Sequence, residues 1–382
     1  MANLKDRLKK IQELRKSEIP RTAPQNAPQN ASRNGSDAPV FSMPGWTQCG
    51  FQVLKRECGA QASLYLKGGL PQALAVLVPD LAGRDLPPPE DFLFFDLETT
   101  GLSGGAGTIA FLAAFGRFVK SGKCHKLRVT QYLLLDYPGE NDFIEAVLKE
   151  FAGNSVIVSY NGKCFDSQIL KMRCLMKGIK PPVYLHADLL HPARRLWKNI
   201  ISDCSQASVE TQILGIDRSG DIPGALAPEI WFEFLKTSNT ERLAGICDHN
   251  LADICGLASI LGAMVNIAAD PFASERKYDI GRLALYWRGF CRRTGNKDLA
   301  VTGDRLLLAA AGNYPCLPVI KAAVFRALAI DAEKKLNDAK VALRFAEQGL
   351  KQLSPDTSLY REFISRVMRL EKRLDGIRLK KK

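Results

Sequence analysis

The stretch that decides the fold is DFLFFDLETTGLSGGAGT, residues Asp91–Thr108, in which an apolar run leads into a glycine-rich bend. Nearly every side chain from Phe92 to Leu97 is apolar, and this pattern predicts a strand covered on both faces. Side chains two positions apart lie on the same face of a strand, so Asp96 and Glu98 should point the same way. Because two adjacent carboxylates repel each other, the pair indicates a site for cations.

The composition predicts a soluble protein of two or three globular domains. The chain has 382 residues, and none of its apolar runs comes near the length that crosses a bilayer, so no membrane association is expected. The N-terminus lacks the apolar segment of a secretory signal, and the ten cysteines form no CxxC pair, which is typical of reduced thiols. These observations predict a cytoplasmic location.

Positive charge is concentrated at the two ends of the chain. The net charge is +13; Met1–Thr22 carries seven Lys or Arg against three Asp or Glu, and Asp270–Lys382 carries 24 against 13. Basic clusters gain affinity for nucleic acid by releasing its counterions, so the distribution predicts a DNA or RNA partner. Solubility alone is the alternative explanation.

The chain before residue 91 is predicted to contain two parts. Residues 1–40 combine a basic segment of helical periodicity with the repeat APQNAPQNAS, which is too polar to bury a core and indicates a disordered linker. Residues 41–90 contain several aromatic residues and an apolar run before the breaker LPPPE. We expect this part to pack as a buttress, of unassigned role, against the domain that follows.

Residues 91–269 alternate between strand and helix patterns. After the acidic strand, the expected elements are strands at Ile109–Val119 and Leu127–Leu135, a helix at Glu140–Phe151, a strand at Ser155–Tyr160, and helices at Phe165–Lys177 and Glu241–Ile267. The first three strands are expected to be antiparallel neighbours. This order predicts an α/β domain whose central strand carries acids at its end.

Four acids of this domain stand out, namely Asp96, Glu98, Asp166 and Asp253. Asp166 begins a predicted helix after the turn signal Asn161-Gly162, and His249 lies one helical turn before Asp253 in HNLAD. Pooled carboxylates can hold two divalent cations, one activating water and both stabilising charge on a phosphoryl group. The set therefore predicts phosphodiester hydrolysis.

His249 has two predicted roles. An imidazole titrates near neutral pH, so His249 is a candidate general base that takes a proton from the attacking water. Its alternative role is that of a helix histidine satisfying a neighbouring carboxylate. Asp188 and Glu210 are left open in the same way, between supporting the site and lying on the surface.

Residues 270–382 are predicted to form a basic all-helical domain. The segment DAEKKLNDAKVALRFAEQGLKQL resembles one unit of a tetratricopeptide array, although three clean periods are not found. The last helix places Arg366, Arg369 and Arg373 at helical spacing, which predicts a nucleic-acid contact surface. The helical region is also a candidate site for a protein partner.

Three motifs, DFLFFDLETTG, SYNGKCFD and HNLAD, resemble those of the DnaQ-like DEDD 3′-to-5′ exonucleases over roughly residues 91–266. With DLLHPARRLW and DIPG, the chain is similar to the YprB-type bacterial branch of that superfamily. The resemblance implies a ribonuclease-H-like mixed sheet flanked by helices and two Mg²⁺ or Mn²⁺ ions. The residues it implies are Asp96, Glu98, Asp166 and Asp253 as metal ligands, and Thr99, Leu102 and Asn161 at the substrate.

One spacing departs from that family. The histidine subclass has four residues between its His and Asp, whereas His249 and Asp253 are separated by three, as in the tyrosine subclass. The function expected is a metal-dependent 3′-to-5′ exonuclease acting on DNA or RNA. The alternatives are a catalytically silent adaptor that binds through the helical tail, and an endonuclease on the same fold.

Overall fold

The computed structural model describes residues 43–65, 69–101, 107–122, 124–153, 156–273, 278–312 and 314–379. The predicted basic helix and linker at 1–40 and the candidate residue Leu102 lie outside the described residues.

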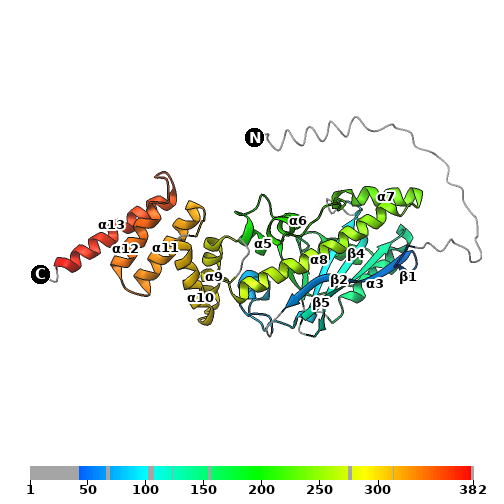
Figure 1. Ribbon diagram of the computed structural model, residues 1–382, viewed down its shortest axis with the longest axis horizontal. Helices are drawn as coiled ribbons and strands as arrows, with labels where there is room; N and C mark the ends of the chain where they lie inside the picture. The colour runs from blue at the N-terminus through cyan, green and yellow to red at the C-terminus, as the bar shows by residue number, and fades with distance from the viewer. Residues whose placement is uncertain are drawn as a thin grey trace, which may run out of the picture. The chain divides into compact units, whose positions relative to one another are not determined.

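A mixed sheet of seven strands occupies the centre of residues 43–269 (Figure 1). Its order is β1-β2-β5-β4-β3-β6-β7; neighbours from β1 to β3 are antiparallel, and β6 and β7 continue parallel to β3. The strands are β1 (Thr47–Gly50), β2 (Val53–Tyr65), β3 (Phe92–Thr99), β4 (Ala110–Ser121), β5 (Cys124–Leu134), β6 (Val156–Ser159) and β7 (Leu185–Asp188). The acidic strand β3 therefore lies inside the sheet, and the predicted antiparallel pairing of the first three strands of the domain is confirmed.

The segment before residue 91 contributes to this same sheet. β2 pairs with β5 along most of its length, from Val53 opposite Leu134 to Tyr65 opposite Cys124. The short helix α2 (Leu74–Leu77) is fully buried and packs against α8. The polar sequence of β2 gives no clear strand pattern, because a strand near a sheet edge need not be apolar on both faces. The predicted buttress thus supplies two strands and a core helix.

The helices of the domain are α3 (Glu140–Glu150), α4 (Asp166–Met176), α5 (Leu190–Trp197), α6 (Gln206–Val209), α7 (Ala227–Thr237) and α8 (Glu241–Ala269), with a π-helical turn η4 (Glu210–Leu214) and a 3₁₀ turn η5 (Gly224–Leu226) before α7. The three helices predicted at Glu140–Phe151, Phe165–Lys177 and Glu241–Ile267 are present as α3, α4 and α8, and further helices lie between α4 and α8. α8 packs on β2, β3 and β4, and Figure 1 shows it lying across the strands.

The two faces of β3 have different partners. Phe95 stacks on Phe115 and meets the edge of Phe151 at the end of α3, whereas Phe92 and Phe94 join the core under α8. Strand alternation then places Asp96 and Glu98 on the α8 face, as predicted. The approach of α8 is close because Gly116 on β4 faces it: a Cβ there would lie 2.6 Å from Ile254 Cγ2.

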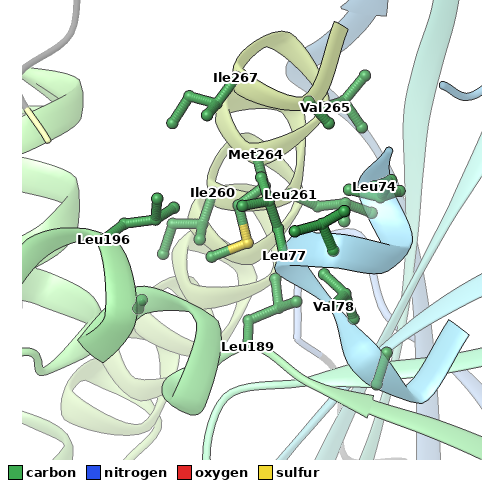
Figure 2. Close-up of a cluster of buried hydrophobic side chains, with 14 of the residues drawn as sticks. Leu74, Leu77, Val78, Leu189, Leu196, Ile260, Leu261, Met264, Val265 and Ile267 are labelled. Carbon is green, nitrogen blue, oxygen red and sulfur yellow. The ribbon is translucent and has the colours of Figure 1, made fainter. Parts of the chain in front are cut away.

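One apolar core connects the sheet domain with the first C-terminal helices. Figure 2 shows Leu74 and Leu77 of α2, Leu196 of α5 and Met264 of α8 pointing into a common cluster. Buried residues of α9 (Ile280–Thr294), α10 (Asp298–Ala311) and α11 (Pro318–Lys334) belong to the same cluster. The described chain from Met43 onward groups as one unit for this reason.

The remaining helices, α12 (Ala339–Leu350) and α13 (Ser358–Leu379), have a small core of their own with α11. Alanines dominate it, and Gly349 lets Phe363 approach so closely that a Cβ would lie 2.3 Å from the ring. The all-helical prediction for this region is confirmed, whereas its tetratricopeptide character stays a prediction.

α8 qualifies one expectation from composition. Among the described residues it alone is long and apolar enough to cross a membrane by length and composition, which is weak evidence on its own. Its most apolar window is 61% buried in the protein, as expected of a core helix. We therefore attribute its apolar sequence to packing on the sheet.

Candidate functional site

Four carboxylates predicted from the sequence converge on the α8 face of the sheet. Asp96 and Glu98 come from β3, Asp166 from the first turn of α4, and Asp253 from the middle of α8. Asp166 is 5% exposed and Glu98 9% exposed. Their charges interact directly, since Asp96 experiences repulsion from each of the other three.

This crowding changes how the acids titrate. Burial, followed by repulsion from the neighbouring carboxylates, raises the pKa of Asp96 well above its usual value, and the same causes raise the pKa of Glu98. Burial also raises the pKa of Asp166 to about 7. Buried carboxylates that repel one another are stabilised when cations lie among them, so the titration behaviour fits a metal centre.

Asp96 is held by a hydrogen-bonded chain of polar side chains. Asn250 of α8 donates its Nδ2 hydrogen to Asp96 Oδ2 at 2.7 Å, and its Oδ1 accepts from Gln131 Nε2 at 3.0 Å. Gln131 Oε1 in turn accepts two bonds from Arg56 of β2. Asn250 and Gln131 are completely buried, so the chain fixes the carboxylate through three elements.

Asp166 depends on the tight turn that precedes α4. Gly162 lies so close that a Cβ would be 2.5 Å from Ser159 Oγ and 2.8 Å from Asp166 Oδ2. The turn is tied down by Asp188, whose carboxylate accepts from the backbone N–H groups of Asn161 and Lys163 at 2.8 and 3.2 Å. Asp188 is 2% exposed, so the structure assigns it a supporting position at the end of β7.

His249 lies between Asp221 on one side and the two acids Glu98 and Asp253 on the other. Its Nδ1 is 2.9 Å from both carboxylate oxygens of Asp221, and its Nε2 lies 3.3 Å from Asp253 Oδ2 and 3.9 Å from Glu98 Oε1. One ligand atom each from Glu98, His249 and Asp253 lie within 4.8 Å of one another, which is close enough to share a cation. His249 thus contacts the acids on both sides, despite the three-residue spacing in HNLAD.

Arg218 is the positive charge within this cluster. Its guanidinium donates to Asp253 Oδ1 at 2.7 Å, to Glu210 Oε2 at 2.9 Å and to Asp221 Oδ2 at 2.8 Å. Glu210 is fully buried, and burial raises its pKa to about 7 against the opposing effect of Arg218. The loop that carries Arg218 and Asp221 thereby holds Asp253 and His249 in place, Arg218 through Asp253 and Asp221 through His249.

Sequence reasoning did not identify Arg218, Asp221, Gln131 or Asn250. Arg218 and Asp221 lie in an irregular loop without periodicity, and the only signal there is the segment DIPG. Gln131 offers a better signal, because it is a polar residue inside an otherwise apolar strand pattern. Glu210, left open between supporting and surface roles, is a buried supporting residue.

The predicted substrate-binding residues have different positions. Thr99 is 5% exposed, and its hydroxyl donates to the Gly101 carbonyl at 3.0 Å, so it shapes the end of β3. Asn161 is exposed and adopts a left-handed φ of 66°, which asparagine tolerates better than most residues. Their roles at a substrate stay predictions, and Leu102 lies outside the described residues.

The donor set fits hard divalent cations. Four carboxylates supply oxygen ligands of the kind that Mg²⁺ and Mn²⁺ prefer, and one imidazole nitrogen is compatible with Mn²⁺. Asp96, Glu98, Asp166 and Asp253 would hold such ions. The assignment of these residues as ligands remains a proposal.

Comparisons with known proteins agree with this fold. Residues 93–265, which contain all four acids and His249, match the family model RNase_H_2 of the RNase_H superfamily. Residues 93–265 therefore have a ribonuclease-H-like fold. Nucleases of this fold use divalent metals, in agreement with the acidic cluster between the sheet and α8.

The chain is also similar to a protein of Bacillus subtilis (strain 168), the "uncharacterized protein YprB", with 40% identity over 173 residues. The match covers 44% of this chain and 41% of that relative, so it spans about two fifths of the relative's length. Among solved structures, the chain is similar to the family B DNA polymerase of Pyrobaculum calidifontis, with 15% identity and a TM-score of 0.38. That similarity covers 75% of this chain and 46% of the polymerase.

Proposed function

We propose that the protein is a metal-dependent nuclease that hydrolyses DNA or RNA from the 3′ end, in the cytoplasm. The observation that carries the proposal is the convergence of Asp96, Glu98, Asp166 and Asp253, from three separate elements, into one largely buried cluster. Nothing in the packing of the sheet requires four acids there, and an unpaired buried charge is costly. The ten cysteines, all free thiols, support a reducing compartment.

When bound, two divalent cations supply an activated water and stabilise charge on the phosphoryl group. The protein's own contribution is to place the acids rigidly, through Asn250 beneath Asp96 and through the Gly162 turn beside Asp166. Rigid ligands cost little reorganisation during the reaction, which is where such sites gain rate.

His249 is suited to accept a proton at one particular atom. Nδ1 lies 2.9 Å from both oxygens of the Asp221 carboxylate, which can only accept a hydrogen bond, and 3.3 Å from Arg218 Nη2, which can only donate one. We assign the N–H of the ring to Nδ1, because the contacts to Asp221 are the shorter ones, and Nε2 then keeps its lone pair. Nε2 is the nitrogen that faces Glu98 and Asp253. We assign His249 as the general base and Asp221 as the residue that orients it.

The test uses the full chain with end-labelled single strands and Mg²⁺ or Mn²⁺. A 5′ label should give a ladder of successively shorter fragments, a 3′ label should be released at once, and a closed circle should resist. Asp96→Asn and Asp166→Asn should each lower the rate by more than about 100-fold, since losing an outer partner of a metal ligand alone costs about 10–100-fold. The exposed Asp298→Asn is the matched control.

Two results would contradict the proposal. Cleavage of the closed circle would make the protein an endonuclease. If both aspartate variants kept the wild-type rate with an unchanged melting temperature, the activity would not belong to this site, and an adaptor role would follow.

A further inference from the structure

A groove of about 630 Å³ lies beside the proposed active site, between α4 and the segment that leads into β7. One wall comes from Lys163, Ser167 and Lys171, and the other from Lys180 and the run Pro181–Tyr184. Ser167 directly follows Asp166, so the groove begins one residue from a proposed metal ligand.

The groove carries positive charge that the protein does not neutralise. Lys171 and Lys180 are exposed, and neither forms an ion pair with any residue that the structure describes. Lys163 is already paired, with its Nζ 2.5 Å from Asp80 Oδ1. No carboxylate lines the groove, so its two free ammonium groups are available to an anionic ligand.

A chain of hydrogen bonds between neutral side chains connects the two walls of the groove. The Tyr184 hydroxyl donates to Ser167 Oγ at 3.0 Å, Ser167 Oγ lies 3.2 Å from His186 Nδ1, and His186 Nε2 lies 2.7 Å from Ser159 Oγ. Burial lowers the pKa of His186 to about 4, so the ring is neutral at pH 7. The chain of bonds ends at Ser159, which also contacts the Gly162 turn.

The wall that carries Lys180 is apolar at its rim. Pro181, Pro182 and Val183 line it, and Val183 is 93% exposed. Ammonium groups beside an exposed apolar surface suit a ligand that alternates phosphates with flat apolar bases, as a single strand of nucleic acid does. An acidic peptide would use the lysines but leave the apolar rim without a matching group.

We propose that this lysine groove binds the segment of a single-stranded nucleic acid next to the nucleotide that is hydrolysed, with phosphates at Lys171 and Lys180. The proposal rests on the nuclease function above and adds the path of the strand. It explains why free lysines gather next to a cluster of acids that would otherwise repel a polyanion.

The test measures binding of a labelled 20-nucleotide single strand by fluorescence anisotropy in EDTA, where metal-dependent hydrolysis is stopped. Lys171→Gln with Lys180→Gln should weaken binding about 10–30-fold at 0.1 M salt and flatten the salt dependence by about 1.4 in slope, the value for two phosphate contacts. Lys340→Gln with Lys351→Gln removes the same charge from exposed positions at the two ends of α12, the second being the residue that follows the helix, and should change neither quantity.

Hydrolysis assays then separate this proposal from the nuclease function. The groove variant should cleave a dinucleotide at the wild-type rate and the 20-nucleotide strand more slowly. If the wild type hydrolyses nothing but its binding depends on the two lysines, the nuclease function fails and the groove stands. If the groove variant binds as the α12 control does, or if a polyglutamate peptide displaces the strand from the groove at equal concentration, the groove proposal is wrong.

Discussion

At the scale of single residues, the site is defined by how its carboxylates are kept in place. Asp96 has a buried amide beneath it, and Asp166 has a glycine beside it that leaves no room for a side chain. Asp253 and Glu210 both pair with Arg218, whose positive charge balances that of Asp253. These three acids are thus each held in a different way, by residues outside the proposed set of metal ligands.

Replacing Asn250 tests the device under Asp96. Asn250→Ala removes the 2.7 Å bond and leaves the Gln131 amide facing a void, so Asp96 loses its fixed orientation. We expect activity to fall by about 10–100-fold and the Mg²⁺ concentration for half-maximal activity to rise. Asn266→Ala, at an exposed position of the same helix, should behave as wild type. Equal Mg²⁺ titrations for both variants would show that Asn250 does not orient the acid.

At the scale of elements, α8 decides the geometry of the site. It carries His249, Asn250 and Asp253, and two glycines let its neighbours pack closely against it, one on the sheet and one on the helix itself. Gly116 admits the helix to β4, and Gly256 admits the carboxylate of Glu210 to the helix, since a Cβ at Gly256 would lie 1.7 Å from Glu210 Oε1. Small residues at these contacts let polar groups approach a buried helix without a cavity.

Two glycines of α8 provide a matched test of this packing. Gly256→Ala should lower the free energy of unfolding by about 1–3 kcal/mol, because Glu210 is held by Arg218 and Gln206 and has little freedom to move aside. Gly262→Ala meets only Leu64 Cδ1 at 3.7 Å and should stabilise the helix by up to about 1 kcal/mol. Denaturant unfolding of both variants measures the difference. A similar rise in the free energy of unfolding for Gly256→Ala and Gly262→Ala would mean that Glu210 does not constrain the helix.

At the scale of the whole molecule, the C-terminal helices continue the core of the sheet domain. Residues of α9 to α11 share one buried cluster with α2, α5 and α8, so removing them would expose the core of the ribonuclease H domain. The arginines predicted to contact nucleic acid also take part in packing between helices, and their contact with nucleic acid stays a prediction. Arg366 and Arg369 both bond Glu333 of α11, and Arg373 bonds Asn337.

The Arg366–Glu333 pair should therefore matter for stability. Burial acts to raise the pKa of Glu333. The hydrogen bonds from Arg369 and Arg366 outweigh this effect and lower the pKa below its usual value, as expected when the charged form of a carboxyl group is stabilised. Arg366→Ala should lower the free energy of unfolding by about 1–3 kcal/mol. Glu333 is only 10% exposed, and in this variant Arg369 is the one arginine that still pairs with it. Arg361→Ala, at an exposed site on α13, should stay within about 0.5 kcal/mol. Melting curves of the two variants that coincide would exclude this role for Arg366.

The sequence by itself determined the α/β alternation, the acidic strand inside the sheet and the four acids, because apolar periodicity and isolated charges are local signals. It did not reveal that β1 and β2 join the same sheet, since β2 pairs with β5, about 70 positions away in the sequence, and β1 pairs with β2. Only the tertiary structure placed Arg218 and Asp221 beside His249 and brought Arg366 and Arg369 to Glu333. These contacts join loops and helices distant in sequence, and the cost of leaving a buried charge unpaired, which no local pattern records, selects them.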